Sequence, residues 1–531
     1  MGIAAARLVG FVCLTLAGTC FAAEPRLARF TAYDAGDTHV LTSRSASQAR
    51  ALMDDLAKFR ATLEKLLNRK TTSRGIPTYI VIASNTDWEK YLQPRRNVIG
   101  WFQSSRFANY IVMNGDADRG TALATIFHEY THYYLASQFA GVFPPWFNEG
   151  LAELMTYTKF TTQNTAVLQT YAGRAHDARD SKWIPFDRLL IVDQGSPEYT
   201  DHEQASDFYA QAWLTVHYGM VENRGFGRQM IDYLDRLNRL VPQAEATRAF
   251  GDLVAADKLL RDYSRNTKKG SGVLALGEVR PFELGEGKPV SEPEALARVV
   301  DLMFNMYAAP DRIRPLVDSM ARLEPKSARA AIMKARLANY DGDSAAFDRS
   351  IAEADAAIAP NDWKSRRDLA LVVLTAALDD NPTSPRGSTD DQRDMKRALR
   401  WFGNALTHNI DDVEALWGLG TAATRLNVQL DLAEEVLLAA WKAAPANASI
   451  AVSLASLYGV RDEPEKMVIY LKESMRCATD LSTRRWAKDS LERTESWLAE
   501  RAKADDEYRK QREEYERQLA EYEKKYGKRK K

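Results

Sequence analysis

The sequence predicts two consecutive domains, an α+β domain followed by an all-α domain of helical repeats. The chain has 531 residues, which is too long for one hydrophobic core. Helical periodicity mixes with short β-branched runs from about residue 24 to 264. From about residue 292 to 500 the chain is predicted to be helical only. The intervening segment 265–291 is dense in Gly, Pro and charged residues, and is predicted to be a linker that holds a short strand pair at "VLALGEVRPFEL".

The overall charge gives no argument for a nucleic-acid partner, and none is expected. Lys+Arg and Asp+Glu both total 72, so the formal net charge is zero. A hydrophobic content of 45% with 27% charged residues is ordinary for a globular protein.

Residues 1–22 are predicted to be a signal peptide. Arg7 precedes the apolar stretch "LVGFVCLTLAG", and cleavage is expected after Ala22, with Ala23 as the alternative. The apolar stretch is too short for a stable membrane span, and no later stretch is long enough. We therefore expect an exported protein, periplasmic or secreted. Acylation at Cys20, which would make it a lipoprotein, is the less favoured alternative because Thr19 fits that pattern poorly.

Cysteine usage excludes an internal disulfide in the exported chain. Cys13 and Cys20 fall within the signal peptide, which leaves only Cys477.

Three elements are expected before the central motif. Residues 46–69 show apolar residues at helical spacing, at Leu52, Leu56, Phe59, Leu63 and Leu66. "PTYIVIAS" (77–84) is typical of a buried strand, and "NVIGWFQSSRFANYIVMNG" (97–115) of a hairpin.

The stretch "TIFHEYTHYYL" (125–135) carries the central motif. On a helix, His128 and His132 lie on one face and can present ring nitrogens to one tetrahedral ion, with Glu129 beside them as a base. This HExxH spacing predicts a Zn²⁺ site, on a helix whose start Asp116 or Asp118 could cap. The alternative, two buried core histidines, would require partners for four ring nitrogens.

The next segment, "FPPWFNEGLAELM" (143–155), begins a second helix. Here the sequence resembles the gluzincins, the thermolysin-like zinc peptidases, and within them the peptidase-MA type branch often fused to helical repeats. The resemblance covers about 75 to 262 and implies that His128, His132 and Glu149 bind zinc, with Glu129 as the general base. It also implies that Glu153 hydrogen-bonds a ligand histidine. Without the resemblance, Glu149 and Glu153 would be an exposed charge pair.

Two departures qualify the resemblance. Only sixteen residues separate His132 from Glu149, so the connection must be tight, and the Gly-x-Met-x-Asn motif of aminopeptidases is absent. Gluzincins also place a Tyr or His downstream to stabilise the oxyanion. Tyr209, His217 and Tyr218 are the candidates, and Tyr209 is preferred, although it could simply pack in the core. A bound peptide is expected to extend the sheet at "YIVMN", predicted as an edge strand.

The helical region 292–500 resembles tetratricopeptide repeats. Pro325 and Pro360 are 35 residues apart, close to the period of about 34 in that family, and "DDNPTSPRGSTDDQ" (379–392) is predicted to be an inserted loop. Two repeats match best, through Trp417, Ala433, Leu437, Ala440 and Pro445, then Ala455, Tyr458 and Leu471. An ordinary helical bundle is the alternative. The charged tail 501–531 is predicted to be a solvated helix, or a short coiled coil through Tyr508, Tyr515 and Tyr522.

Together these features predict an α+β zincin-like metallopeptidase domain followed by an all-α tetratricopeptide-like solenoid. The expected function is an exported zinc metallopeptidase that cleaves a peptide or protein substrate, while the repeats bind a protein partner. The alternative is a non-catalytic or weakly catalytic envelope scaffold that acts through its repeats.

Overall fold

The fold was analysed in a computed structural model of the chain, which describes residue 27 and residues 29–527. Within that range, residues 73–75, 95–97, 140–142, 171, 240, 267–268, 307, 379–387 and 479–480 are not described. The predicted signal peptide and most of the predicted loop 379–392 therefore lie outside the described residues. Among the described residues, no helix is both long enough and apolar enough to cross a membrane.

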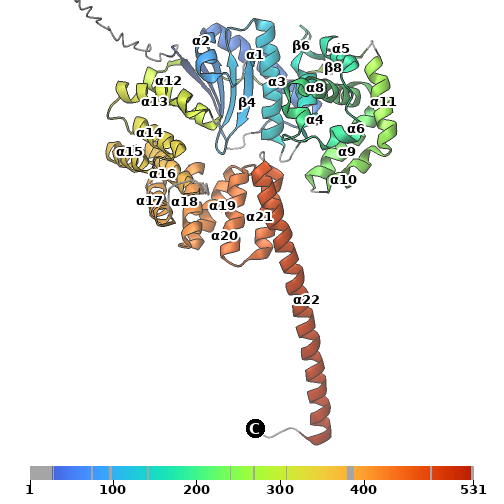
Figure 1. Cartoon of the computed structure of the whole chain (residues 1–531), viewed down its shortest axis with the longest axis vertical. Coiled ribbons are helices and arrows are strands. Elements are labelled where there is room, and N and C mark those ends of the chain that lie inside the picture. Colours follow the sequence, from blue (N-terminus) through green and yellow to red (C-terminus); the bar gives the residue numbers. More distant parts are fainter. Residues whose placement is uncertain are drawn as a thin grey trace, which may run out of the picture.

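A six-stranded sheet in the order β4-β5-β3-β2-β1-β9 forms the centre of the first domain (Figure 1). Its strands are β1 (Thr31–Ala35), β2 (Thr38–Thr42), β3 (Thr78–Ala83), β4 (Gly100–Ser104), β5 (Asn109–Asn114) and β9 (Lys288–Pro289). The predicted strand is confirmed as β3 and the predicted hairpin as β4–β5. The prediction that "YIVMN" is an edge strand is wrong, because β5 pairs with β3 on one side and β4 on the other. On this side of the sheet the edge strand is β4.

The two faces of this sheet are covered by different parts of the chain. Ile80 and Ile82 pack in the cluster that includes α1 (Ala46–Leu66) and α3 (Arg119–Gln138). Val81 and Ala83 point to the opposite face, in the cluster that includes α12 (Glu292–Asn305) and α13 (Pro310–Leu323) of the repeat region. The first repeat helices therefore share a core with the sheet. Two short helical turns, α2 (Asn85–Asp87) and η1 (Trp88–Leu92), follow β3.

A helical lobe carries the second half of the first domain. Its helices are α4 (Pro145–Thr156), α5 (Ala172–Asp180), α6 (Phe186–Ile191), α7 (Pro197–Thr200), α8 (His202–His217), η2 (Tyr218–Glu222), α9 (Arg224–Asn238), α10 (Gln243–Ala246), η3 (Thr247–Phe250) and α11 (Leu253–Arg265). A three-stranded sheet, β6 (Thr158–Phe160), β7 (Thr165–Leu168) and β8 (Gly272–Ala275), borders it.

The segment predicted to be a linker is part of the first domain. Its β8 pairs with β7 of the small sheet and β9 pairs with β1 of the large sheet, so the expected strand pair within the segment does not form. Between these strands, the Arg280 guanidinium lies 2.6 Å from the Glu64 carboxylate, and the Arg60 guanidinium lies 4.1 Å from the centre of the Phe282 ring. The segment returns across α1 because each of its strands finds its partner in a different sheet.

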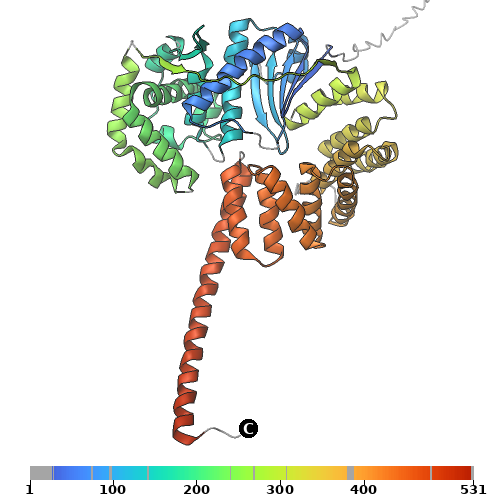
Figure 2. The same cartoon turned by 180° about the vertical axis from the view of Figure 1, so that it is seen from behind.

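The rest of the chain is a tetratricopeptide-like helical repeat region that curves beneath the first domain (Figure 2). Its helices are α12 (Glu292–Asn305), α13 (Pro310–Leu323), α14 (Ala328–Asp341), α15 (Ser344–Ala357), α16 (Trp363–Leu378), α17 (Ser388–Leu406), α18 (Val413–Leu426), α19 (Leu430–Ala443), α20 (Ala448–Val460), α21 (Pro464–Cys477) and α22 (Leu481–Tyr526). The predicted repeat positions Trp417, Ala433, Leu437 and Ala440 are buried between these helices.

The charged tail is the end of α22, a helix of 46 residues that projects from the body (Figure 1). Tyr508, Tyr515 and Tyr522 are 69%, 65% and 51% exposed, as a solvated helix predicts. The coiled-coil alternative stays a prediction.

Candidate metal centre

The HExxH motif lies on α3, beside the edge strand β4. Asp118 caps the helix by accepting a hydrogen bond of 3.1 Å from the backbone N–H of Thr121. Of the two predicted caps, Asp116 and Asp118, it is therefore Asp118 that takes this role. Phe127, Tyr130 and Tyr134 are buried and hold the helix in the core. This packing turns the opposite face of α3, which carries both histidines, toward α4.

The structure brings the three predicted metal ligands together. Oε2 of Glu149 lies 3.6 Å from Nε2 of His128 and 3.5 Å from Nε2 of His132. All three ligand atoms lie within 4.8 Å of one another. Zinc bonds of about 2.1 Å at tetrahedral angles place neighbouring ligand atoms about 3.4 Å apart. The two distances to Glu149 are close to this spacing, and all three atoms are near enough to bind one ion.

Hydrogen bonds determine which ring nitrogen each histidine presents. Thr156 donates its hydroxyl proton to the carbonyl of Ala152 at 2.8 Å, so its oxygen accepts from Nδ1 of His128 at 3.2 Å. Nδ1 of His132 lies 3.0 Å from the side-chain oxygen of Asn148, which also accepts. With Nδ1 carrying the proton in both rings, both Nε2 lone pairs are available to a metal.

The carboxylate of Glu149 is buried and carries the charge of the cluster. Burial alone would raise its pKa, but the charges and hydrogen bonds of His132 and His128 hold that pKa well below its usual range. Burial would likewise lower the pKa of His132, yet attraction by Glu149 and Glu129 raises it to about 9. The negative charge of Glu149 can be balanced by a proton on Nε2 of His132 or by a metal cation bound at the same position. The donor set therefore fits zinc.

One residue of this cluster was not predicted. The Tyr199 hydroxyl donates a hydrogen bond of 2.8 Å to Oε1 of Glu149. Burial and the Glu149 charge raise the pKa of Tyr199, which keeps this hydroxyl protonated and able to donate. No sequence signal links the two residues, since they are fifty positions apart. Thr156, by contrast, lies two helical turns after Glu149, and its periodicity could have indicated it.

The structure differs from the expectation for Glu153. Its carboxylate forms a two-point ion pair with Arg174 of α5, at 2.6 Å and 3.0 Å, rather than a hydrogen bond to a ligand histidine. The strong attraction of the guanidinium turns the carboxylate toward α5. Thr156 and Asn148 take the expected role.

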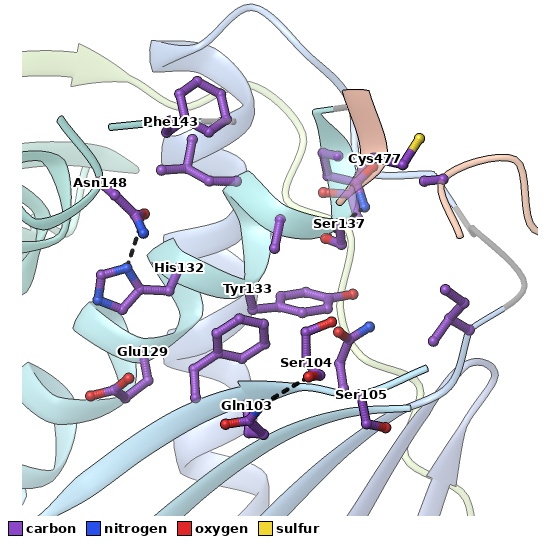
Figure 3. A pocket seen from close by; sticks show the side chains of 18 of the residues that line it. Gln103, Ser104, Ser105, Glu129, His132, Tyr133, Ser137, Phe143, Asn148 and Cys477 are labelled. Carbon is purple, nitrogen blue, oxygen red and sulfur yellow. Dashed lines mark hydrogen bonds between the residues drawn. The ribbon is translucent and has the colours of Figure 1, made fainter. Parts of the chain in front are cut away.

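A cavity of about 1410 Å³ opens beside the cluster (Figure 3). Glu129 and Tyr209 both line it, with His128, His132 and Glu149. The Tyr209 ring stacks on Tyr199 with ring centres 6.1 Å apart, so both roles proposed for Tyr209, packing and hydrogen-bond donation, remain compatible with its position.

The other two oxyanion candidates lie outside this cavity. His217 is buried, with Nδ1 2.8 Å from the Tyr263 hydroxyl and Nε2 3.1 Å from the carbonyl of Gly270. The Tyr218 hydroxyl accepts a hydrogen bond of 2.8 Å from Asn223. Both residues hold the helical lobe together instead.

Comparison of the sequence with protein-family models and with curated proteins gives no match. Comparison of the fold with solved structures finds helical repeat proteins. The thermophilic TPR protein TTC0263 of Thermus thermophilus is similar over 38% of this chain and 98% of its own, with 16% identity and a TM-score of 0.31. The type IV pilus biogenesis factor PilW is similar over 39% of this chain and 91% of its own, with 14% identity and a TM-score of 0.30. Yeast Tom70 is similar over 62% of this chain and 70% of its own, with 14% identity and a TM-score of 0.29.

At these scores the likenesses do not bear on function. The description of residues 292–477 as tetratricopeptide-like rests on their own consecutive helix pairs.

Proposed function

We propose that this chain is an exported zinc-dependent hydrolase of peptide bonds, of the gluzincin type, acting in the periplasm or after secretion. The observation that supports it is the convergence of His128, His132 and Glu149 within 4.8 Å, beside a cavity that also holds Glu129. A structural zinc site is normally closed by four protein ligands, whereas three ligands facing a cavity leave a position for substrate or water.

In this proposal the three ligands hold Zn²⁺, which would polarise a substrate carbonyl and make water acidic. Glu129 takes a proton from the attacking water and passes it to the leaving amine, since its carboxylate shares the cavity with the ligand set. Tyr209 donates a hydrogen bond to the developing oxyanion. Thr156, Asn148 and Tyr199 keep the three ligands oriented.

The test is elemental analysis of the purified mature protein beside a His128→Ala, His132→Ala double variant. About one zinc per chain, lost in the double variant, is the expected result. The Glu129→Gln variant should keep its zinc and lose peptide hydrolysis, because only the base is removed. Absence of zinc, even after its addition, would contradict the proposal.

A second function is supported by the repeat region, which offers a long curved surface of stacked helix pairs. Such surfaces commonly bind peptides or proteins. On this alternative the chain is an envelope scaffold, and its metal-site domain is structural or weakly catalytic. Full function in a Glu129→Gln strain, combined with loss of function on removing the repeats, would favour it.

A further inference from the structure

The cavity at the metal centre is built by two parts of the chain that are far apart in sequence. One wall comes from α3 and β4, including Gln103 and Tyr133. The other comes from the repeat region, at residues 446–449, where α20 begins, at residues 477–478, where α21 ends, and at residues 482–483, where α22 begins. Figure 3 shows Cys477 on the far side of the cavity from His132. The repeats therefore enclose the metal centre instead of lying apart from it.

A defined contact holds the repeats in this position. The turn between β4 and β5 inserts Arg106 and Phe107 into the repeat region. The Arg106 guanidinium lies 4.5 Å from the Trp417 ring centre, and the Phe107 ring packs edge-on against Trp417 at 5.2 Å. Asn447 donates a hydrogen bond of 2.6 Å to the Arg106 carbonyl, and Ser449 lies 3.3 Å from the Arg106 guanidinium. Since Trp417 also bonds to Ser453 of α20, the repeat wall is tied directly to the edge strand.

The chemistry of the walls indicates what they accept. Among the described residues, the part of the cavity lining that comes from the repeats is uncharged and includes Ala446, Ala448, Ser449 and Ala478, which offer contact area and hydrogen bonds. Opposite it, β4 is paired on one side only within the described sheet, so its backbone groups can pair with another extended backbone. These two features suit the main chain of an extended polypeptide.

The size of the cavity limits the substrate further. A volume of about 1410 Å³ exceeds the 300–1,000 Å³ typical of pockets for small molecules. A folded domain of 100 residues, with a radius of gyration of about 13 Å, is far too large to enter between the walls. An extended chain segment meets both limits.

We propose that the helix ends of the repeats at residues 446–449, 477–478 and 482–483 form the far wall of the substrate site, and that the substrate is an extended, unfolded polypeptide segment held between them and β4. Cleavage of that segment rests on the proposed hydrolase function, but its binding does not. The repeats thus select substrates by conformation rather than by a particular side chain.

The test fills the cavity from the repeat side, far from the metal ligands. Ala446→Trp and Ala448→Trp are made in the full mature chain with Glu129→Gln, so that binding is measured without turnover. Ala439→Trp is the matched control, because Ala439 is exposed on α19 and does not line the cavity. Circular dichroism and thermal unfolding establish that each variant is folded. Binding of fluorescein-labelled unstructured dodecapeptides of mixed sequence is followed by fluorescence anisotropy. A second, unrelated protein serves as the competitor, once unfolded by reduction and alkylation and once in its native form.

We expect the dodecapeptides to bind at least tenfold more weakly to the folded Ala446→Trp and Ala448→Trp variants than to the chain with Glu129→Gln alone. Their affinity for the Ala439→Trp control should be unchanged. Only the unfolded competitor should displace them. The inference is overturned if the folded cavity variants bind like the control, if no peptide binds, if native protein competes equally, or if chito-oligosaccharide binds in place of peptide. Peptide binding with this pattern but no zinc and no cleavage by the unsubstituted chain would overturn the proposed hydrolase while leaving this inference in place.

Discussion

Tyr199 and Glu149 are joined by a hydrogen bond of 2.8 Å from the tyrosine hydroxyl to Oε1 of the carboxylate. The bond occupies one carboxylate oxygen and leaves the other, Oε2, facing Nε2 of His128 and His132. A loop and a short helix, α7, thereby orient a ligand that belongs to α4.

Removing this bond should weaken metal binding. Tyr199→Phe keeps the ring but loses the hydroxyl, so Glu149 is free to rotate and zinc affinity should fall about tenfold or more. Competitive titration against a zinc chelator measures the change. Tyr340→Phe, at an exposed position in the repeat region, is the control, and equal affinities for the two variants would contradict the orienting role.

Thr156 and Glu153 can be compared directly as partners of the ligand histidines. Thr156→Val removes the acceptor of His128 Nδ1 and should lower zinc affinity about 10- to 100-fold. Glu153→Gln breaks the ion pair with Arg174 and should leave the affinity nearly unchanged. The same chelator titration distinguishes them, and the reverse ranking would favour the role that the family resemblance implies for Glu153.

Tyr209 is expected to act on the reaction and not on the metal. Tyr209→Phe should lower kcat/KM about 10²- to 10³-fold, as loss of one oxyanion donor does, while zinc content stays the same. Tyr218→Phe is the control, since Tyr218 does not line this cavity. An unchanged kcat/KM in Tyr209→Phe would mean that this tyrosine only packs.

His217 should make the protein sensitive to acid. The pKa of this histidine falls from 6.5 to about 4 in the folded state, mainly because its ring is buried. Between these values the unfolded chain binds a proton that the folded chain does not, so stability is full above pH 6.5 and falls as the pH approaches 4. The loss is on the order of 3 kcal/mol. In His217→Gln, the fall in Tm between pH 7 and pH 4.5 should be smaller, whereas His176→Gln, at an exposed site, should behave like the unsubstituted protein.

Gly150 lets α4 approach α8 closely enough to place Glu149. A Cβ at this position would lie 2.4 Å from the backbone oxygen of Ala212, which cannot move without shifting α8. Gly150→Ala should therefore cost about 1–3 kcal/mol and lower the Tm. Gly277→Ala is the control because a Cβ there meets nothing within 4 Å. Equal Tm values for the two variants would show that the helices accommodate the methyl group.

Much of the site could be predicted because its pattern is local. Two histidines four apart share a helix face whatever surrounds the helix, and Asp118 caps the helix that follows it directly. The position of Glu149 was expected only from the family resemblance, because nothing local relates a residue on α4 to α3.

The wrong predictions concern pairing between distant segments. The strand "YIVMN" shows the same alternation whether it lies at the edge or inside the sheet, so its neighbours could not be foreseen. The segment 265–291 has the composition of a linker, yet its strands join two different sheets.

The sequence by itself determined the helices α1, α3 and α4, the strands β3, β4 and β5, the helical character of the repeat region and the spacing of the HExxH motif, because these depend on backbone preferences and periodicity within a few residues. Only the tertiary structure decided that Tyr199 orients Glu149, that Arg174 captures Glu153, and that the repeats at Trp417 return to enclose the metal centre. Such contacts join residues tens to hundreds of positions apart, and they form only where packing of the whole chain brings complementary groups within bonding distance.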